Sequence, residues 1–169
     1  MKTKDDKIKI GCCGFAMAQK EYFRHFKLVE IQQTFYKLPQ LSTAKKWQEA
    51  APQDFEFTMK AWQLITHEPS SPTYSRLGRV IDPSENEHYG GFRCTKEVLE
   101  AWECTAMVAY ELGATHVVFQ CPASFKPTED NIENMRKFFS RIDRGSLLFN
   151  NKWMKDDALR FMELMKGGA

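Results

Sequence analysis

The sequence has little of what marks several large protein classes. Its five cysteines are an odd number and contain no Cys-x-x-Cys pair, which argues against a disulfide framework and against a zinc or iron–sulfur site. No apolar run approaches the length of a membrane span. The net charge is only +2 and no basic stripe is visible, so nucleic-acid binding finds little support.

Five of the first seven residues are charged and no apolar run follows them, so the sequence shows no signal peptide. We therefore expect a cytoplasmic protein that does not associate with membranes. No group of acidic residues or histidines has the spacing of metal ligands, so no metal site is predicted. The sequence does not identify a cofactor.

The composition is that of a globular protein, with 43% hydrophobic and 27% charged residues. A chain of 169 residues is long enough for one domain with a sizeable core. We interpret residues 1–169 as a single domain, in which residues 1–144 form four βα units and residues 145–169 form a final one.

Strand patterns and helix patterns alternate along the chain. Strands are predicted at 7–14, 27–36, 54–60, 114–122 and 146–151, and helices at 43–51 (with Ser42 as N-cap), 95–113, 127–142 and from about 155. This alternation predicts an α/β fold with a parallel sheet and right-handed crossovers. A functional site is then expected at the carboxyl ends of the strands.

The predicted strand 27–36 has an unusual polar face. In an extended strand Leu28 shares a face with Glu30, Gln32 and Thr34. Because the neighbouring strands are apolar, this polar face is expected to line a cavity rather than to meet solvent.

Residues 61–93 lose all periodicity and collect proline and glycine, which predicts a long loop over the functional end of the fold. His67 opens this loop and is the histidine best suited to proton transfer. The alternative is that His67 anchors the loop through a hydrogen bond. For Tyr36, Trp62 and Tyr74 the alternatives are stacking on a flat or sugar-like ligand and core packing or loop anchoring.

Glu30, Gln32 and Lys60 are expected to face one another across adjacent strands. They would serve as a general acid or base and an anion contact, or form a buried ion pair without further function. Asn150 and Asn151 either lie at a pocket rim or cap the next helix. The candidate catalytic residues are Glu30 and His67, and the candidate ligand-binding residues are Gln32, Thr34, Tyr36, Lys60, Gln120, Asn150 and Asn151.

Taken together, several segments resemble one known family. The segments are Lys9–Phe15, Val29–Tyr36, Trp47 with Ala50–Pro52, Phe55–Ala61, Ile65–His67, Gln120–Pro122 and Phe149–Asn151. In this order they resemble the YecE-like family of TIM-barrel proteins, domain of unknown function 72, particularly its archaeal branch.

The resemblance implies an eight-stranded barrel, which takes about 250 residues or roughly 30 per unit. This chain has room for about five units. Two family segments have no counterpart, a strand ending in Glu-x-Arg and a strand with Tyr-x-Arg-x-His-Gly, and the join falls near residues 142–146. We therefore expect an open or incomplete barrel: an open sheet, a homo-oligomer that covers the open edges, or an internally deleted form of low stability.

For function, the resemblance and the strand ends favour a site that binds a small polar or anionic ligand, with hydrolase or lyase chemistry. A second hypothesis is a truncated, non-catalytic remnant or a binding or assembly module. A third, nucleic-acid binding, rests on analogy with barrel repair nucleases, and the near-neutral charge speaks against it.

Overall fold

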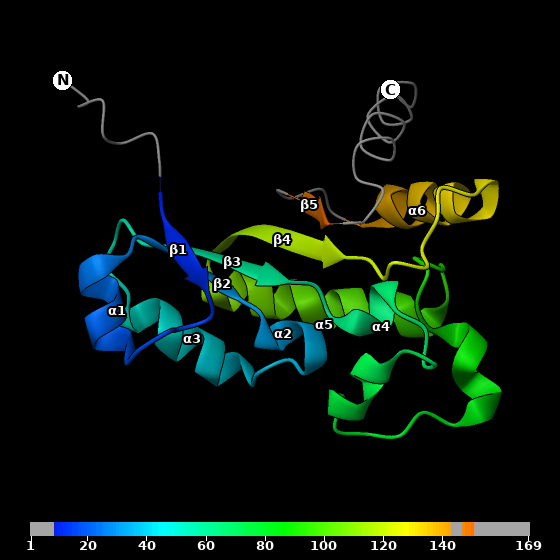
Figure 1. The fold of residues 1–169 in the computed structure, drawn as a ribbon, viewed down its shortest axis with the longest axis horizontal. Coiled ribbons are helices and arrows are strands. Elements are labelled where there is room, and N and C mark those ends of the chain that lie inside the picture. The colour runs from blue at the N-terminus through cyan, green and yellow to red at the C-terminus, as the bar shows by residue number, and fades with distance from the viewer. Residues whose placement is uncertain (1–8, 143–146, 151–169) are drawn as a thin grey trace.

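The fold is a parallel sheet with helices beside it, seen here in a computed structural model. The structure describes residues 9–142 and the backbone of residues 147–150. The strands follow one another in sequence order and every neighbouring pair is parallel. They are β1 (Gly11–Cys13), β2 (Leu28–Ile31), β3 (Glu56–Lys60), β4 (Ala114–Gln120) and β5 (Leu147–Asn150). The predicted α/β fold with an open parallel sheet is confirmed (Figure 1).

The helices connect the strands in the manner expected of βα units. They are α1 (Gln19–His25), α2 (Gln33–Tyr36), α3 (Leu41–Ala50), α4 (Gln63–Thr66), α5 (Lys96–Leu112) and α6 (Glu129–Arg141), with 3-10 helices η2 (Pro72–Arg76) and η3 (Pro83–His88). Helices α1, α3 and α5 lie along one side of the sheet (Figure 1). No helix in the described part of the chain is long and apolar enough to cross a membrane.

Helix α5 forms where its sequence signals predict it. The Thr95 side chain accepts a hydrogen bond from the Val98 amide at 3.4 Å, which caps the first turn. Gly113 ends the helix in the left-handed conformation, with φ of +63°. The buried side chains recur at helical spacing, which fixes the face that packs on the core: Val98, Ala101, Thr105, Val108 and Leu112.

The predicted strand 27–36 is wrong in its second half. The strand ends at Ile31, and the chain turns into the short helix α2. The Thr34 hydroxyl lies 2.7 Å from the Ile31 carbonyl oxygen, and a local bond of this kind competes with extended backbone. Thr34 therefore does not share a strand face with Glu30.

The predicted cap of the third helix is also wrong. Helix α3 begins at Leu41, Gln40 occupies the N-cap position in extended conformation, and no side chain caps the helix. Ser42 thus lies inside the first turn instead of preceding it.

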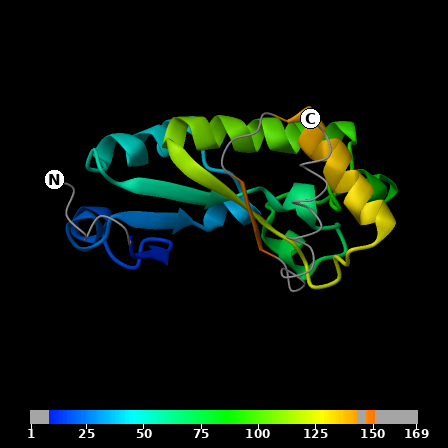
Figure 2. The ribbon, with the colours of Figure 1, turned by 90° about the horizontal axis from the view of Figure 1, so that it is seen from above.

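The segment 61–93 contains helices α4, η2 and η3 and is more ordered than the predicted loop. The end of the segment lies beside its start, because the Gly90 and Phe92 amides donate to the carbonyl oxygens of Leu64 and Ile65 at 2.8 and 2.9 Å. The segment gathers at the end of the molecule toward which β3 and β4 point (Figures 1 and 2). The expected placement over the strand ends is therefore confirmed.

Strands β2 and β3 have one apolar face and one polar face. Val29, Ile31, Phe57 and Met59 are almost completely buried and belong to the same core cluster as α5 residues such as Val108. The alternate positions of β2 and β3, which point the other way, are only partly buried. This alternation carries Glu30 and Lys60 to the face opposite the helices.

Candidate functional site

Four polar side chains meet at the carboxyl ends of β2, β3 and β4. We call this group the strand-end cluster: Glu30, Gln32, Lys60 and Gln120. Gln32 donates from Nε2 to Glu30 Oε1 at 3.2 Å, and Lys60 Nζ lies 3.9 Å from the same oxygen. Lys60 Nζ also lies 3.5 Å from Gln120 Oε1. The predicted convergence of these residues is thus present in the fold.

The contacts of the Lys60 ammonium are long. A normal charge-assisted hydrogen bond from an ammonium to an oxygen is about 2.7–2.9 Å, and both the Glu30 and the Gln120 oxygen lie well beyond that. The Lys60 and Glu30 side chains are 17% and 25% exposed, so solvent reaches them. The ammonium carries three donors, and no described side chain accepts from it at short distance.

Thr34 and Tyr36 follow β2 in the helical turn of α2. The Thr34 hydroxyl is completely buried and lies 2.7 Å from the carbonyl oxygens of both Ile31 and Lys60. The Tyr36 ring has the Arg76 guanidinium 3.5 Å above its centroid. Thr34 is therefore placed to hold the backbone at the end of β3. One face of the Tyr36 ring is covered by Arg76.

His67 is buried, with 6% of its surface exposed. Its Nδ1 lies 2.8 Å from the Thr66 hydroxyl, and its ring packs edge-on against Phe35 at 4.9 Å. Burial, followed by the charge of Lys60, lowers the pKa of His67 to about 4. At neutral pH the ring is uncharged and is therefore a poor proton donor. The Tyr74 hydroxyl donates to the His67 carbonyl oxygen at 2.7 Å. This bond agrees with the loop-anchoring alternative for Tyr74.

Of the last two predicted residues, the structure describes the backbone of Asn150. Asn150 is in register with Gln120 at the carboxyl end of β5. Its backbone therefore lies at the same end of the strands as the strand-end cluster. Asn151 lies outside the described residues.

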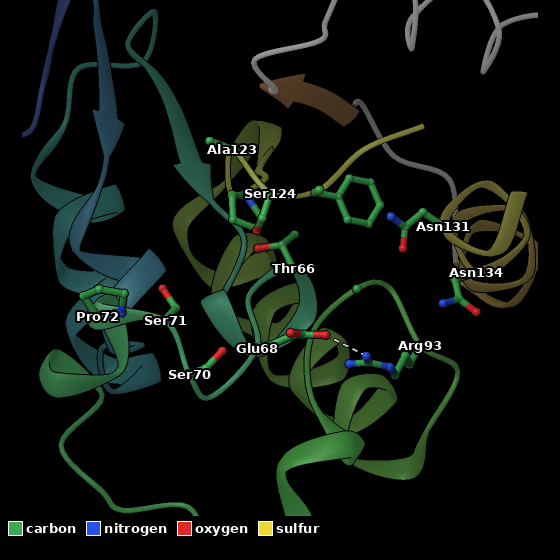
Figure 3. Close-up of a pocket in the computed structure, with 13 residues that line it drawn as sticks. Thr66, Glu68, Ser70, Ser71, Pro72, Arg93, Ala123, Ser124, Asn131 and Asn134 are labelled. Atoms are coloured by element: carbon green, nitrogen blue, oxygen red, sulfur yellow. Dashed lines mark hydrogen bonds and ion pairs between the residues drawn. The ribbon is translucent and has the colours of Figure 1, made fainter. Parts of the chain in front are cut away.

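A pocket of about 510 Å³ opens beside these strand ends (Figure 3). Its walls come from the segments that follow β3 and β4 and from helix α6. We call it the polar pocket; it is lined by Thr66, Glu68, Ser70, Ser71, Pro72, Gly91, Arg93, Pro122, Ala123, Ser124, Phe125, Asn131 and Asn134. None of the predicted site residues lines it, although Thr66 precedes His67 and Pro122 follows Gln120 by two positions.

Comparison with known proteins decides the family. Residues 16–168 match the family model described as Protein of unknown function DUF72. The chain belongs to the DUF72 family. The resemblance inferred from the sequence segments is thereby confirmed. No match was found among the curated proteins.

Solved structures of DUF72 proteins share the fold. A DUF72 family protein from Enterococcus faecalis V583 superposes with a TM-score of 0.62 at 18% identity, covering 94% of this chain and 57% of its own. One from Thermotoga maritima MSB8 gives a TM-score of 0.58 at 19% identity, covering 94% of this chain and 61% of its own. This DUF72 chain is therefore shorter than both relatives and matches only part of each structure.

Sequence reasoning missed the polar pocket in this DUF72 chain. Its polar side chains come from segments with no hydrophobic periodicity, and the pairs Ser70-Ser71 and Asn131 with Asn134 were the available signals. Across residues 9–142, no group of three or more histidine, cysteine, aspartate or glutamate side chains could hold a metal ion.

Proposed function

We propose that this DUF72 chain binds a small polar or anionic ligand at the strand-end cluster, with Lys60 as its principal contact. The supporting observation is the position of Lys60 Nζ, which lies 3.9 Å from Glu30 Oε1 and 3.5 Å from Gln120 Oε1. A ligand oxygen at normal hydrogen-bond distance would offer the ammonium a better partner than either side chain does. The carboxyl ends of parallel strands are also where α/β proteins generally bind ligands.

Glu30 is the proposed acid or base for hydrolase or lyase chemistry at this cluster. Its carboxylate is partly exposed and accepts a hydrogen bond from the Gln32 amide at 3.2 Å, so the carboxylate is held in place and solvent still reaches it. His67 was the other catalytic candidate. Its burial and lowered pKa favour a positioning role for the neutral ring.

The second candidate function is a non-catalytic binding module. It is favoured by length, because the chain covers only 55–61% of the solved DUF72 structures. Hydrolysis of a panel of 4-nitrophenyl esters and glycosides distinguishes the two candidates. Turnover that is lost in Glu30→Gln supports an enzyme, whereas ligand binding without turnover supports a module.

Binding is tested by calorimetric titration with malonate, with its uncharged analogue malonamide and with inorganic phosphate. Lys60→Met removes the charge but keeps the aliphatic stem, and Lys45→Met on the exposed surface of α3 is the matched control. We expect Lys60→Met to weaken binding by about tenfold, the equivalent of one charge-assisted hydrogen bond, and Lys45→Met to leave it unchanged.

Glu30→Gln gives the complementary result. It removes a negative charge 3.9 Å from Lys60 Nζ, so malonate should bind several-fold more tightly. The proposal fails if none of the three probes binds at millimolar concentration. It also fails if both the Lys60 and the Glu30 variants keep the binding and the stability of the wild-type protein.

A further inference from the structure

We propose that the polar pocket is a second binding site, specific for a neutral polyhydroxylated small molecule of the monosaccharide class. The pocket shares no residue with the strand-end cluster, so this inference stands apart from the proposed function. Its volume of about 510 Å³ falls within the range of about 300–1,000 Å³ typical of small-molecule sites.

The charges in the pocket wall cancel each other. Arg93 Nη2 donates to Glu68 Oε1 at 2.7 Å, and Arg93 Nη1 donates to the Tyr89 carbonyl oxygen at 2.6 Å. Figure 3 shows the Glu68 and Arg93 side chains directed toward each other along one wall. No other lining residue is charged. A phosphate or carboxylate would meet the Glu68 carboxylate wherever it approached Arg93, which disfavours an anionic ligand.

The remaining polar groups suit hydroxyl groups of a ligand. The Ser70 and Ser124 hydroxyls and the Asn134 amide line the pocket, and no hydrogen-bond partner is found for them among the described residues. Asn131 donates from Nδ2 to the Lys126 carbonyl oxygen at 2.8 Å, which leaves its side-chain oxygen as an acceptor. Hydroxyl and amide groups supply both donors and acceptors, which is the pairing that a sugar hydroxyl needs.

The pocket also has apolar surface. Phe125 lines one side and Pro72 and Pro122 contribute elsewhere. Sugars present C–H groups beside their hydroxyls, and a site with a few polar groups on a partly apolar wall can fix both. The combination of neutral polar groups, an internally paired charge and apolar surface therefore selects a neutral hydroxylated ligand over an anion.

The test uses saturation-transfer-difference NMR on the full chain with D-glucose, D-galactose, D-mannose and D-ribose. The double variant Ser124→Ala/Asn134→Ala removes a hydroxyl and an amide from the pocket. The control Ser42→Ala/Asn86→Ala makes the same exchanges at two exposed positions outside it. We expect saturable binding of at least one sugar, about tenfold weaker in the pocket variant and unchanged in the control. All variants are compared at matched thermal stability, measured by circular dichroism.

Competition separates this site from the strand-end cluster. Inorganic phosphate should not displace the sugar, and Lys60→Met should bind the sugar as the wild-type protein does. The inference is overturned if no sugar of the panel binds saturably, or if the pocket variant and the control bind alike. It is equally overturned if phosphate displaces the sugar or if Lys60→Met abolishes sugar binding.

Discussion

The hydroxyl of Thr34 lies 2.7 Å from the carbonyl oxygen of Lys60. Thr34 belongs to the turn after β2, and Lys60 is the last residue of β3. The Thr34 side chain is completely buried and links the ends of β2 and β3. The link is made at Lys60, whose ammonium belongs to the strand-end cluster. Thr34 is thus placed to hold the end of β3 in position, and its predicted contact with a ligand stays a prediction.

Thr34→Val should destabilise the protein by about 1–3 kcal/mol, since the isosteric methyl group removes the one buried hydroxyl donor that lies within hydrogen-bond distance of the Ile31 and Lys60 carbonyl oxygens. Urea unfolding measures the effect. Thr34→Ser keeps the hydroxyl and should recover most of the loss. Equal stability of the Val and Ser variants would show that the hydrogen bond contributes little.

Gly90→Ala should destabilise the protein by at least about 2 kcal/mol. Gly90 has φ of +78°, and an added Cβ would lie 2.5 Å from the backbone carbonyl of His67. The strain of the left-handed conformation and the steric overlap of the Cβ with the His67 backbone would both lower the stability. Gly78→Ala is the control, because its φ is +81° but the nearest atom to an added Cβ is 3.7 Å away, on the Lys37 side chain. Thermal unfolding should show a clearly smaller loss for Gly78→Ala, and equal losses would contradict the crowding at Gly90.

His67 should make the fold sensitive to acid. Its pKa is lowered to about 4 in the fold, whereas an unfolded histidine titrates near 6.5, so the unfolded chain binds more protons between these values. The stabilising contribution is complete above about pH 6.5 and is lost as the pH falls toward 4. The full effect is at most about 3 kcal/mol.

The measurement is the free energy of unfolding at pH 7.5 and pH 4.5 for the wild-type protein and for His67→Gln. The variant should lose less stability on acidification than the wild-type protein. His116→Gln, at a less buried position, should retain the wild-type pH dependence. The same pH dependence in all three proteins would contradict the assignment to His67.

The sequence predicted the sheet and the residues of the strand-end cluster for a physical reason. In β2 and β3 the alternation of apolar and polar residues matches the pleat of a strand, so Glu30 and Lys60 were placed on one face correctly. The same rule failed from Gln32 onward, because the Thr34 hydroxyl bonds to the Ile31 carbonyl oxygen and the backbone turns helical. A prediction based on the alternation of polar and apolar residues does not take such a local hydrogen bond into account.

The polar pocket depends on contacts between segments that are distant along the chain. Gly90 and Phe92 bond to Leu64 and Ile65, and this return brings Arg93 beside Glu68. Asn131 and Asn134 then face the pocket from helix α6. Neither residue propensity nor spacing predicts such long-range contacts, so only isolated polar residues in an irregular segment were visible before the fold was known.

The most direct test of the central claim is the NMR resonance of the Lys60 side-chain nitrogen during titration with malonate. If Lys60 is the principal ligand contact, its Nζ resonance should shift saturably, and the resonances of exposed lysines such as Lys45 should not. The shift should follow the same binding curve as the calorimetric titration. A Lys60 resonance that stays fixed while malonate binds would contradict the account.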